Sequence, residues 1–391
     1  MAAKKTHHSH RRRKAMAAKK THHSHRRRKA MAAELSPDIV LFHILARLPA
    51  KSVVRFKCVS KGWHSFLTTP MFTNMHLHHQ NRHKLLFIPK TSSSCTFRTI
   101  DCESPKDGLT APRSLPFKVD SPRNVSIITS FNGLVCVGII EQDNVEEEYY
   151  SDLVLWNPLT CEYRILSKTN AHKECYETTT RASVLYYTSS EDDYKLLRVT
   201  NSCDAYIYSL KSDLWRKIES TENFHRWISN HCALLNGKLY FLKYDEAINK
   251  SHLVISLDLK TEKFTEVTTP FFRDSTAICM GFTVLRGCIH VWMLHHSDLW
   301  RRIELWRMDG DGDSWMKVVT CTNAACGCTW CVQPLHLMAD GNWLMRYGEC
   351  LCITDPNDPL NSTRVVTDMG TGIRRRGKCI ETLVSPNQYM K

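Results

Sequence analysis

The distribution of apolar and polar positions divides the chain into three regions. Residues 1–30 have no periodic apolar positions, residues 31–76 carry apolar residues three and four apart, and residues 77–391 carry short apolar runs between turn residues. Spacing of three and four is typical of amphipathic helices, whereas short runs bounded by Gly, Asn and Asp are typical of β-strands. The pattern predicts a small all-α domain followed by a large all-β domain.

The first predicted helix has a clear start and end. Ser36 is a favourable N-cap, Pro37 suits the first helical position, and Asp38 suits the positive end of the helix dipole. Apolar positions at helical spacing continue to about Arg47, and Pro49 ends the pattern. This predicts one short helix with an apolar face.

Two more short helices are predicted after Pro49. One covers about 51–60 and the other carries Trp63, Phe66 and Leu67. Three short helices form a poor core, because a segment of fewer than about 40 residues seldom folds alone. We therefore expect the apolar surface of residues 31–76 to be completed by a partner.

The predicted β region contains a repeat of about 50 residues. Turn-plus-strand units begin at 131, 235, 285 and 339, and their glycines, Gly133, Gly237, Gly287 and Gly341, are 104, 50 and 54 apart, so one interval is skipped. Strand–turn–strand units begin at 153, 205, 253 and 303. Such a period is typical of kelch repeats, in which each repeat is one propeller blade, and the length allows roughly six blades. The tryptophans at 156, 215, 306 and 315 are predicted to pack between blades.

The net charge of +14 comes mostly from the first region. Residues 1–15 recur unchanged at 16–30 and contain no acid; without both copies, 41 basic residues face 39 acidic ones. We expect this basic His/Arg-rich tail to be disordered, because it has no apolar surface to bury. The favoured interpretation of the repeat is a duplicated leader before a possible translation start at Met31; the alternatives for its two RRRK runs are a nuclear-import signal and weak nucleic-acid contacts.

The cysteines indicate a reducing compartment. The 17 cysteines are odd in number and widely scattered, and no apolar run approaches the roughly 20 residues of a membrane span. We expect reduced thiols and a location in the cytoplasm, the nucleus or both.

Candidate metal and catalytic groups are few. Cys321, Cys326, Cys328 and Cys331 with His336 could supply zinc ligands, but they lack paired C-x-x-C spacing, so loop or core cysteines are the favoured interpretation. A Cys–His nucleophile would need a proximity that sequence does not show, and the DGDGDS run at 309–314 fits a hairpin turn better than a calcium loop. We expect no catalytic residue, no metal and no cofactor.

The predicted helical region resembles a known motif. The run LSPDIVLFHILARLPAKSVVRFKCVSKGWHSFLTTPMF at 35–72 is similar to the F-box of plant F-box proteins. The β region resembles the F-box-associated interaction domain of the same proteins, through LWNPLTCEYRIL, YSLKSDLWRKI, SLDLKTEKF, IELWRM and the closing IETLVSP at 380. Together the two resemblances cover about 35–386.

This resemblance implies a function and a set of contact residues. It implies a non-catalytic substrate-recognition adaptor of a cullin-based, SCF-type ubiquitin-protein ligase, in which the F-box docks on a Skp-type adaptor and the propeller holds a protein client of unknown identity for ubiquitination. The predicted adaptor-binding residues are Leu35, Pro37, Ile44, Leu45, Leu48, Pro49, Val53, Phe56, Val59 and Trp63.

Two other functions stay open at this point. One is a nuclear, nucleic-acid-associated regulator that uses the basic tail; the near-neutral balance of residues 31–391 argues against it. The other is an F-box protein that acts outside a ligase. No membrane partner is expected.

Overall fold

The computed structural model describes most of the chain after residue 38. The described residues are 39–89, 95–119, 125–140, 150–168, 180–200, 204–218, 228–245, 250–267, 277–296, 301–309, 314–322, 332–348, 350–358, 362–366 and 376–390. The predicted basic tail, the helix start at Ser36 to Asp38 and the predicted contact residue Leu35 lie outside them. The chain divides into two compact units, Met1–Leu48 and Pro49–Lys391.

The described part of the first unit is helical, but not a regular α-helix. A π-helical segment, η1 (Ile39–Ile44), continues into a 3-10 turn, η2 (Leu45–Arg47). The helix ends at Arg47 as predicted, and the Leu48 N–H donates to the Leu45 carbonyl at 3.2 Å. Leu48 is extended, with ψ 153°, because the proline that follows disfavours the helical conformation.

Three α-helices open the second unit: α2 (Ala50–Phe56), α3 (Lys61–Leu67) and α4 (Pro70–His78). The Ser60 hydroxyl caps α3 by accepting from the Trp63 N–H at 3.1 Å, and the Thr69 hydroxyl caps α4 by accepting from the Phe72 N–H at 3.2 Å. Helix α4 is an addition to the three predicted helices. Thr69 and Pro70 form a usable start signal for it, an N-cap residue followed by proline at the first helical position.

Six four-stranded antiparallel sheets make up the described remainder of the second unit. Blade I consists of β24 (Arg376–Ile380), β1 (His83–Phe87), β2 (Thr96–Asp101) and β3 (Arg113–Ser114), and blade II of β4 (Val125–Phe131), β5 (Leu134–Ile140), β6 (Tyr150–Trp156) and β7 (Tyr163–Ile165). Blade III consists of β8 (Thr180–Thr188), β9 (Asp193–Thr200), β10 (Ala205–Ser209) and β11 (Leu214–Lys217), and blade IV of β12 (Ile228–Leu235), β13 (Lys238–Asp245), β14 (Lys250–Asp258) and β15 (Phe264–Val267). Blade V consists of β16 (Ala277–Leu285), β17 (Cys288–His296), β18 (Arg301–Asp309) and β19 (Ser314–Thr322), and blade VI of β20 (Val332–Leu337), β21 (Trp343–Tyr347), β22 (Cys350–Thr354) and β23 (Thr363–Val366). A 3-10 turn, η3 (Pro105–Asp107), follows β2.

Each blade buries both of its faces against its neighbours. In β9 every residue is buried; Tyr194 and Leu196 pack in the cluster shared with blade II, whereas Leu197 and Val199 pack in the cluster shared with blade IV. Comparable clusters lie between blades IV and V, V and VI, VI and I, and I and II. The alternation of side chains along a strand thus serves two interfaces at once.

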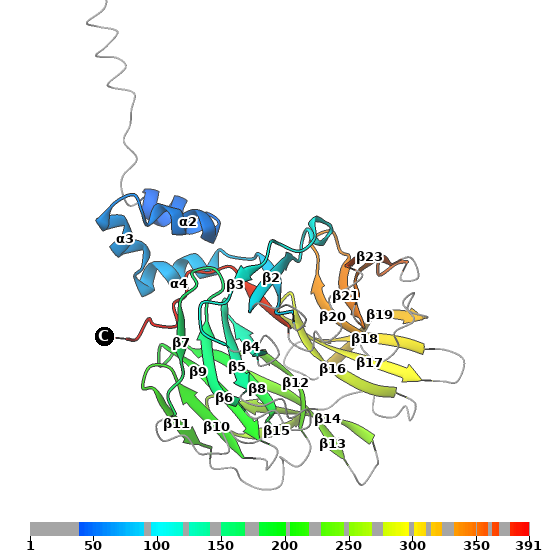
Figure 1. Ribbon diagram of the computed structural model, residues 1–391. Coiled ribbons are helices and arrows are strands. Elements are labelled where there is room, and N and C mark those ends of the chain that lie inside the picture. The colour runs from blue at the N-terminus through cyan, green and yellow to red at the C-terminus, as the bar shows by residue number, and fades with distance from the viewer. Residues whose placement is uncertain are drawn as a thin grey trace, which may run out of the picture. The chain divides into compact units, whose positions relative to one another are not determined.

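Blade I closes the ring by joining the two ends of the domain. Strand β24 pairs with β1, placing Cys379 opposite Lys84, although these residues are 295 positions apart in the chain. The cyan strand β2 lies near the orange strands β20 and β21 of blade VI in Figure 1.

The segment after β24 is also held in place. The Asn157 side-chain amide donates to the Thr382 carbonyl at 3.1 Å and to the Val384 carbonyl at 2.7 Å, and the Thr382 hydroxyl donates to the Asn132 carbonyl at 2.8 Å. Gly133, with φ 84°, lies so close to Thr382 that a β-carbon there would clash with it. Blade II therefore anchors the chain beyond the last strand.

The predicted kelch-type propeller of about six blades is confirmed. The skipped repeat is blade III, whose β8–β9 turn at residues 189–192 has no glycine and places Asp192 at φ 50°. Trp156 is fully buried and meets Phe97 of blade I edge-to-face, with ring centroids 4.7 Å apart. Trp215 belongs to the cluster between blades II and III, while Trp306 and Trp315 pack against that between blades IV and V.

Replacing Trp156 by alanine should lower the free energy of unfolding of the propeller by about 3–5 kcal/mol, because it leaves a cavity between blades I and II. Urea denaturation followed by circular dichroism measures this loss. Trp315→Ala is the matched control, since Trp315 is only partly buried. Equal losses in the two variants would contradict this account of the blade interfaces.

Candidate functional site

The predicted contact residues of the first unit differ in exposure. Ile44 is 40% exposed, Leu48 is half-buried and Leu45 is buried. Ile39, which was not among the predicted contact residues, is also exposed. Ile44 therefore offers apolar surface to a partner, whereas Leu45 in this conformation packs inside the chain. Leu35 and Pro37 are not among the described residues.

The predicted contact residues of the second unit show the same division. Val59, in the turn between α2 and α3, is 60% exposed. Pro49, Phe56 and Trp63 are half-buried, and the Phe56 and Trp63 rings meet edge-to-face with centroids 5.8 Å apart. Val53 is fully buried and supports the helices from within. Met71 on α4 is a further exposed apolar residue that the sequence prediction did not include.

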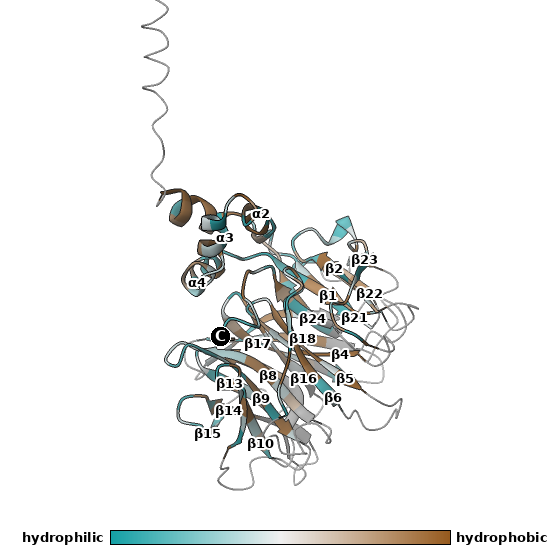
Figure 2. Cartoon of the chain, turned by 60° about the vertical axis from the view of Figure 1, so that its left-hand side comes forward, coloured by the Kyte–Doolittle hydropathy of each residue, from teal (hydrophilic) through white to brown (hydrophobic). Residues whose placement is uncertain are grey.

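Exposed branched apolar side chains on short helices indicate a binding surface, because exposing them to water is unfavourable. Figure 2 shows hydrophobic colour along the helical segment that starts the described chain. The Phe56–Trp63 ring pair fixes the approach of α3 to α2, so the turn that carries Val59 has a defined conformation. These helices therefore present apolar side chains on an ordered backbone.

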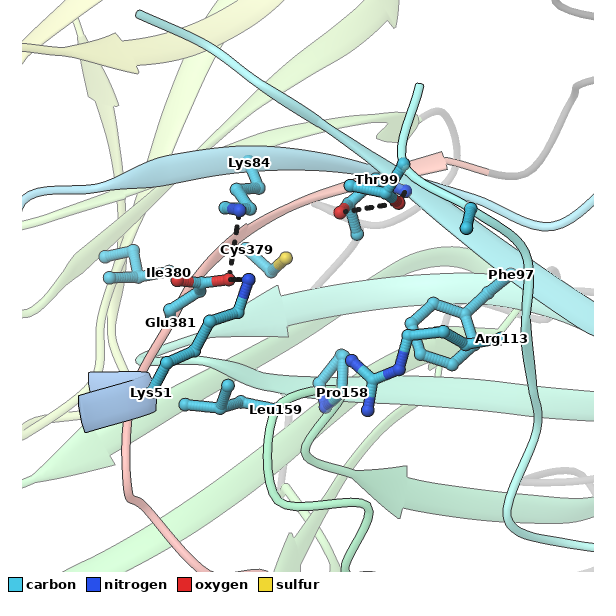
Figure 3. Close-up of a pocket in the computed structure, with 12 residues that line it drawn as sticks. Lys51, Lys84, Phe97, Thr99, Arg113, Pro158, Leu159, Cys379, Ile380 and Glu381 are labelled. Atoms are coloured by element: carbon cyan, nitrogen blue, oxygen red, sulfur yellow. Dashed lines mark hydrogen bonds and ion pairs between the residues drawn. The ribbon is translucent and has the colours of Figure 1, made fainter. Parts of the chain in front are cut away.

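A cavity of about 210 Å³ lies between α2, blade I and the β6–β7 turn. Lys51 of α2 and Lys84 of β1 point from two sides toward Glu381, as Figure 3 shows. Their ammonium groups lie 3.1 Å and 3.0 Å from the same carboxylate oxygen. Arg113, on the opposite wall, stacks over the Phe97 ring at 5.1 Å and donates to the Cys161 sulfur at 3.1 Å.

The two lysines change the ionisation of Glu381. Burial alone raises the pKa of this carboxyl, but the hydrogen bonds and charges of Lys84 and Lys51 outweigh it, so the pKa is lower than usual. Glu381 is therefore ionised at neutral pH and is shared between a helix and a strand.

Two buried cysteines among the described residues, Cys102 and Cys379, are not activated nucleophiles. Burial raises the pKa of Cys102 and of Cys379 to about 12, so both thiols stay protonated at neutral pH. No group of three or more metal-ligating side chains occurs within the described residues. Of the candidate zinc ligands, Cys326, Cys328 and Cys331 lie outside them, and His336 is bonded to Glu103 instead.

Comparison with known proteins assigns both parts of the chain. Residues 37–75 match the F-box domain, and residues 86–342 match the F-box associated beta propeller domain. The chain belongs to the F-box-associated β-propeller family. An F-box/kelch-repeat protein from Arabidopsis thaliana is 25% identical over 380 residues, covering 88% of this chain and 94% of the relative.

Two further Arabidopsis thaliana proteins agree with this plant F-box assignment. A putative F-box/kelch-repeat protein is 24% identical over 311 residues, covering 73% of this chain and 70% of the relative. A putative F-box protein is 30% identical over 258 residues, covering 61% of this chain and 57% of the relative. The resemblance seen in the sequence is thus confirmed for both the F-box and the propeller.

The F-box match extends past the three predicted helices into α4, and the propeller match begins within β1. None of the described helices of this F-box protein is both long and apolar enough to cross a membrane. Sequence reasoning missed Lys84 and Glu381, since no local pattern links residues so far apart. A charged residue inside the closing IETLVSP motif was the one available signal.

Glu381→Gln should destabilise the propeller by roughly 2 kcal/mol at pH 7, between the values for exposed and buried ion pairs, because it leaves Lys84 without its carboxylate. The folded-state pKa of Glu381 lies below its unfolded value. Its contribution is therefore complete above the unfolded pKa and is lost as the pH falls through the folded one.

Urea denaturation of both proteins between pH 7 and about pH 3 tests this pH dependence. The difference between wild type and variant should shrink as the pH falls. Asp152→Asn is the control, because the Asp152–Lys168 pair is exposed and should contribute less. A constant difference across the range would contradict the assigned pairing.

Proposed function

We propose that this chain is the substrate-recognition subunit of an SCF-type ubiquitin-protein ligase. In this proposal the F-box docks on the Skp-type adaptor, the adaptor links it to a cullin scaffold, and the propeller holds the client protein. The observation that carries the proposal is the presence of both modules in one chain, an F-box at 37–75 and a propeller at 86–342.

The exposed apolar residues support the docking step. Ile44 and Val59 carry enough exposed surface for a partner to cover, and full burial of such a side chain contributes about 1.5–3 kcal/mol before association costs are subtracted. Leu48, Pro49, Phe56 and Trp63 are partly exposed and can extend the contact. Leu45 and Val53 are buried in this structure, so they support the helices, and a direct contact with the adaptor would require them to become exposed.

The chain contributes position rather than chemistry in this proposal. A client held on the propeller meets the ubiquitin-charged conjugating enzyme within one assembly, so an encounter between separate molecules becomes an intramolecular one. The effective concentration of a client lysine then replaces its concentration in solution. Buried, protonated thiols such as Cys102 and Cys379 are consistent with a non-catalytic subunit. A cytoplasmic or nuclear location, where thiols stay reduced, fits this assignment.

Charged substitutions at the exposed apolar residues should abolish docking without unfolding the chain. We expect Ile44→Lys and Val59→Lys each to reduce retention of a purified Skp-type adaptor on the immobilised full chain at least tenfold, because a lysine ammonium would be desolvated at the interface. The double variant Leu48→Ala with Pro49→Ala should also weaken retention.

The matched control is Ile165→Lys, which places the same charge at a 55% exposed position on β7 of blade II. It should retain the adaptor fully, and circular dichroism should show the same β content in all variants. Undiminished adaptor retention by both Ile44→Lys and Val59→Lys would refute docking through these residues.

The client is identified by affinity purification of the full chain with and without proteasome inhibition. A client marked for degradation should accumulate when the proteasome is inhibited. The Val59→Lys variant should still recover the unmodified client, but it should no longer recover the ubiquitinated form. Recovery of a client without any adaptor would instead favour a role outside a ligase.

A further inference from the structure

A second cavity, of about 390 Å³, lies where blades I, V and VI meet. Its walls come from the start of β1, the segment that follows β2, strand β24, the β16–β17 turn, and the end of β20 with the turn that follows. We name it the inter-blade pocket and define it by His83, Glu103, Arg286, His336, Leu337 and Lys378. Strands β16, β20 and β24 are edge strands of their sheets, and β16 lies next to β20.

The one carboxylate in the wall of this pocket is already committed. One oxygen of Glu103 lies 2.7 Å from His336 Nε2, and the other accepts from the Ala339 N–H at 2.9 Å. Burial raises the pKa of Glu103, but these two hydrogen bonds outweigh it and the pKa is lowered. Glu103 therefore stays ionised and ties blade I to blade VI.

Two cations face that single carboxylate. Arg286 donates from Nη2 to the Met338 carbonyl at 2.7 Å, a neutral acceptor. Lys378 is half-buried, and within the described part of the chain its ammonium has no carboxylate at ion-pair distance. Burial lowers the pKa of Lys378, and the charge of Glu103 only partly offsets that effect.

An uncompensated cation in a cavity favours an anion. Burying an ammonium without a partner is costly, and a charge-assisted hydrogen bond to an incoming anion offsets that cost. The cavity beside α2 differs, because there Lys51 and Lys84 already share Glu381. Arg113 of that cavity stacks on Phe97 and donates to the Cys161 sulfur. In the inter-blade pocket, Lys378 is a lining cation that no described carboxylate pairs with.

The histidines and the apolar wall restrict the shape of the anion. The His83 and His336 rings lie 5.2 Å apart, and His83 Nδ1 is buried without a hydrogen-bond partner. Burial, with the nearby Lys378 charge, lowers the pKa of His83 to about 3, so its ring is neutral at pH 7 and can exchange a hydrogen bond. Val284, Leu285 and Leu337 add apolar surface that suits a hydrocarbon stem.

We propose that the inter-blade pocket binds an anionic side chain of a client polypeptide, with Lys378 and Arg286 contacting the carboxylate or phosphate and Leu337 contacting its stem. The cavity volume lies within the range of ordinary ligand sites and is large enough for one side chain and its backbone. This inference rests on the proposed function, since it names the chemistry by which the propeller recognises its client.

The test uses three pools of fluorescein-labelled heptapeptides that differ only in a fixed central residue, glutamate, phosphoserine or glutamine, with mixed residues on either side. The full chain is immobilised and the captured fluorescence is measured at low salt. We expect the glutamate or the phosphoserine pool to be captured at least tenfold more than the glutamine pool. The better of the two anionic pools identifies the source of the charge.

Variants locate the binding. Lys378→Met and Arg286→Gln should each lower capture of the better anionic pool about tenfold or more. Lys260→Gln is the matched control, because Lys260 is exposed in the β14–β15 turn of blade IV. Thermal melting checks the fold, and Lys378→Met should melt no lower than wild type, since it removes a desolvated charge.

The outcomes separate this inference from the proposed function. Equal capture of all three pools, or undiminished capture by Lys378→Met and Arg286→Gln, overturns the pocket assignment. Retention of a Skp-type adaptor is measured on the same protein. Adaptor retention without anionic capture refutes the pocket alone, whereas anionic capture that depends on Lys378, without adaptor retention, supports the pocket and refutes the ligase role.

Discussion

The pairing of β24 with β1 is the constraint on which the rest of the propeller depends. A propeller blade cannot bury both faces unless it has a neighbour on each side, so an open array would leave the first and last blades exposed. The pairing that sets Cys379 opposite Lys84 makes β24 a strand of blade I, so the last strand of the domain completes the first blade. The hydrogen bonds from Asn157 and Thr382 then hold the segment beyond that strand.

Both cavities follow from this closure. Glu381 and Lys378 are three residues apart on the closing segment, yet one lines the cavity beside α2 and the other lines the inter-blade pocket. Neither side chain would meet its neighbours in an open ring, because Lys84 and His336 belong to strands far away in the sequence. The charged lining of both cavities is thus a consequence of how the ends of the domain join.

The sequence predicted the repeated part of the fold much better than the unique part. A recurring turn glycine with period near 50 led to the blades, since Gly133 and its equivalents need a positive φ at each tight turn. It did not reveal which strand closes the ring, because register between distant strands depends on tertiary packing. Helical spacing likewise found the F-box but gave Leu45 and Val53 the same weight as Ile44 and Val59. Apolar periodicity does not tell which side chains of a small domain are buried within the chain and which stay exposed.

Net charge is a poor guide to recognition in such a domain. Residues 31–391 are close to neutral, which argues against a general affinity for nucleic acid. Closure of the ring nevertheless distributes the charges unevenly between the two cavities. In the cavity beside α2, Lys51 and Lys84 share Glu381. In the inter-blade pocket, Lys378 lies near Glu103, which is already bonded to His336. An interaction in a desolvated cavity is stronger than the same interaction at an exposed surface. In the proposed anion-binding pocket, one ammonium can therefore contribute more to selectivity than many lysines on the outer strands.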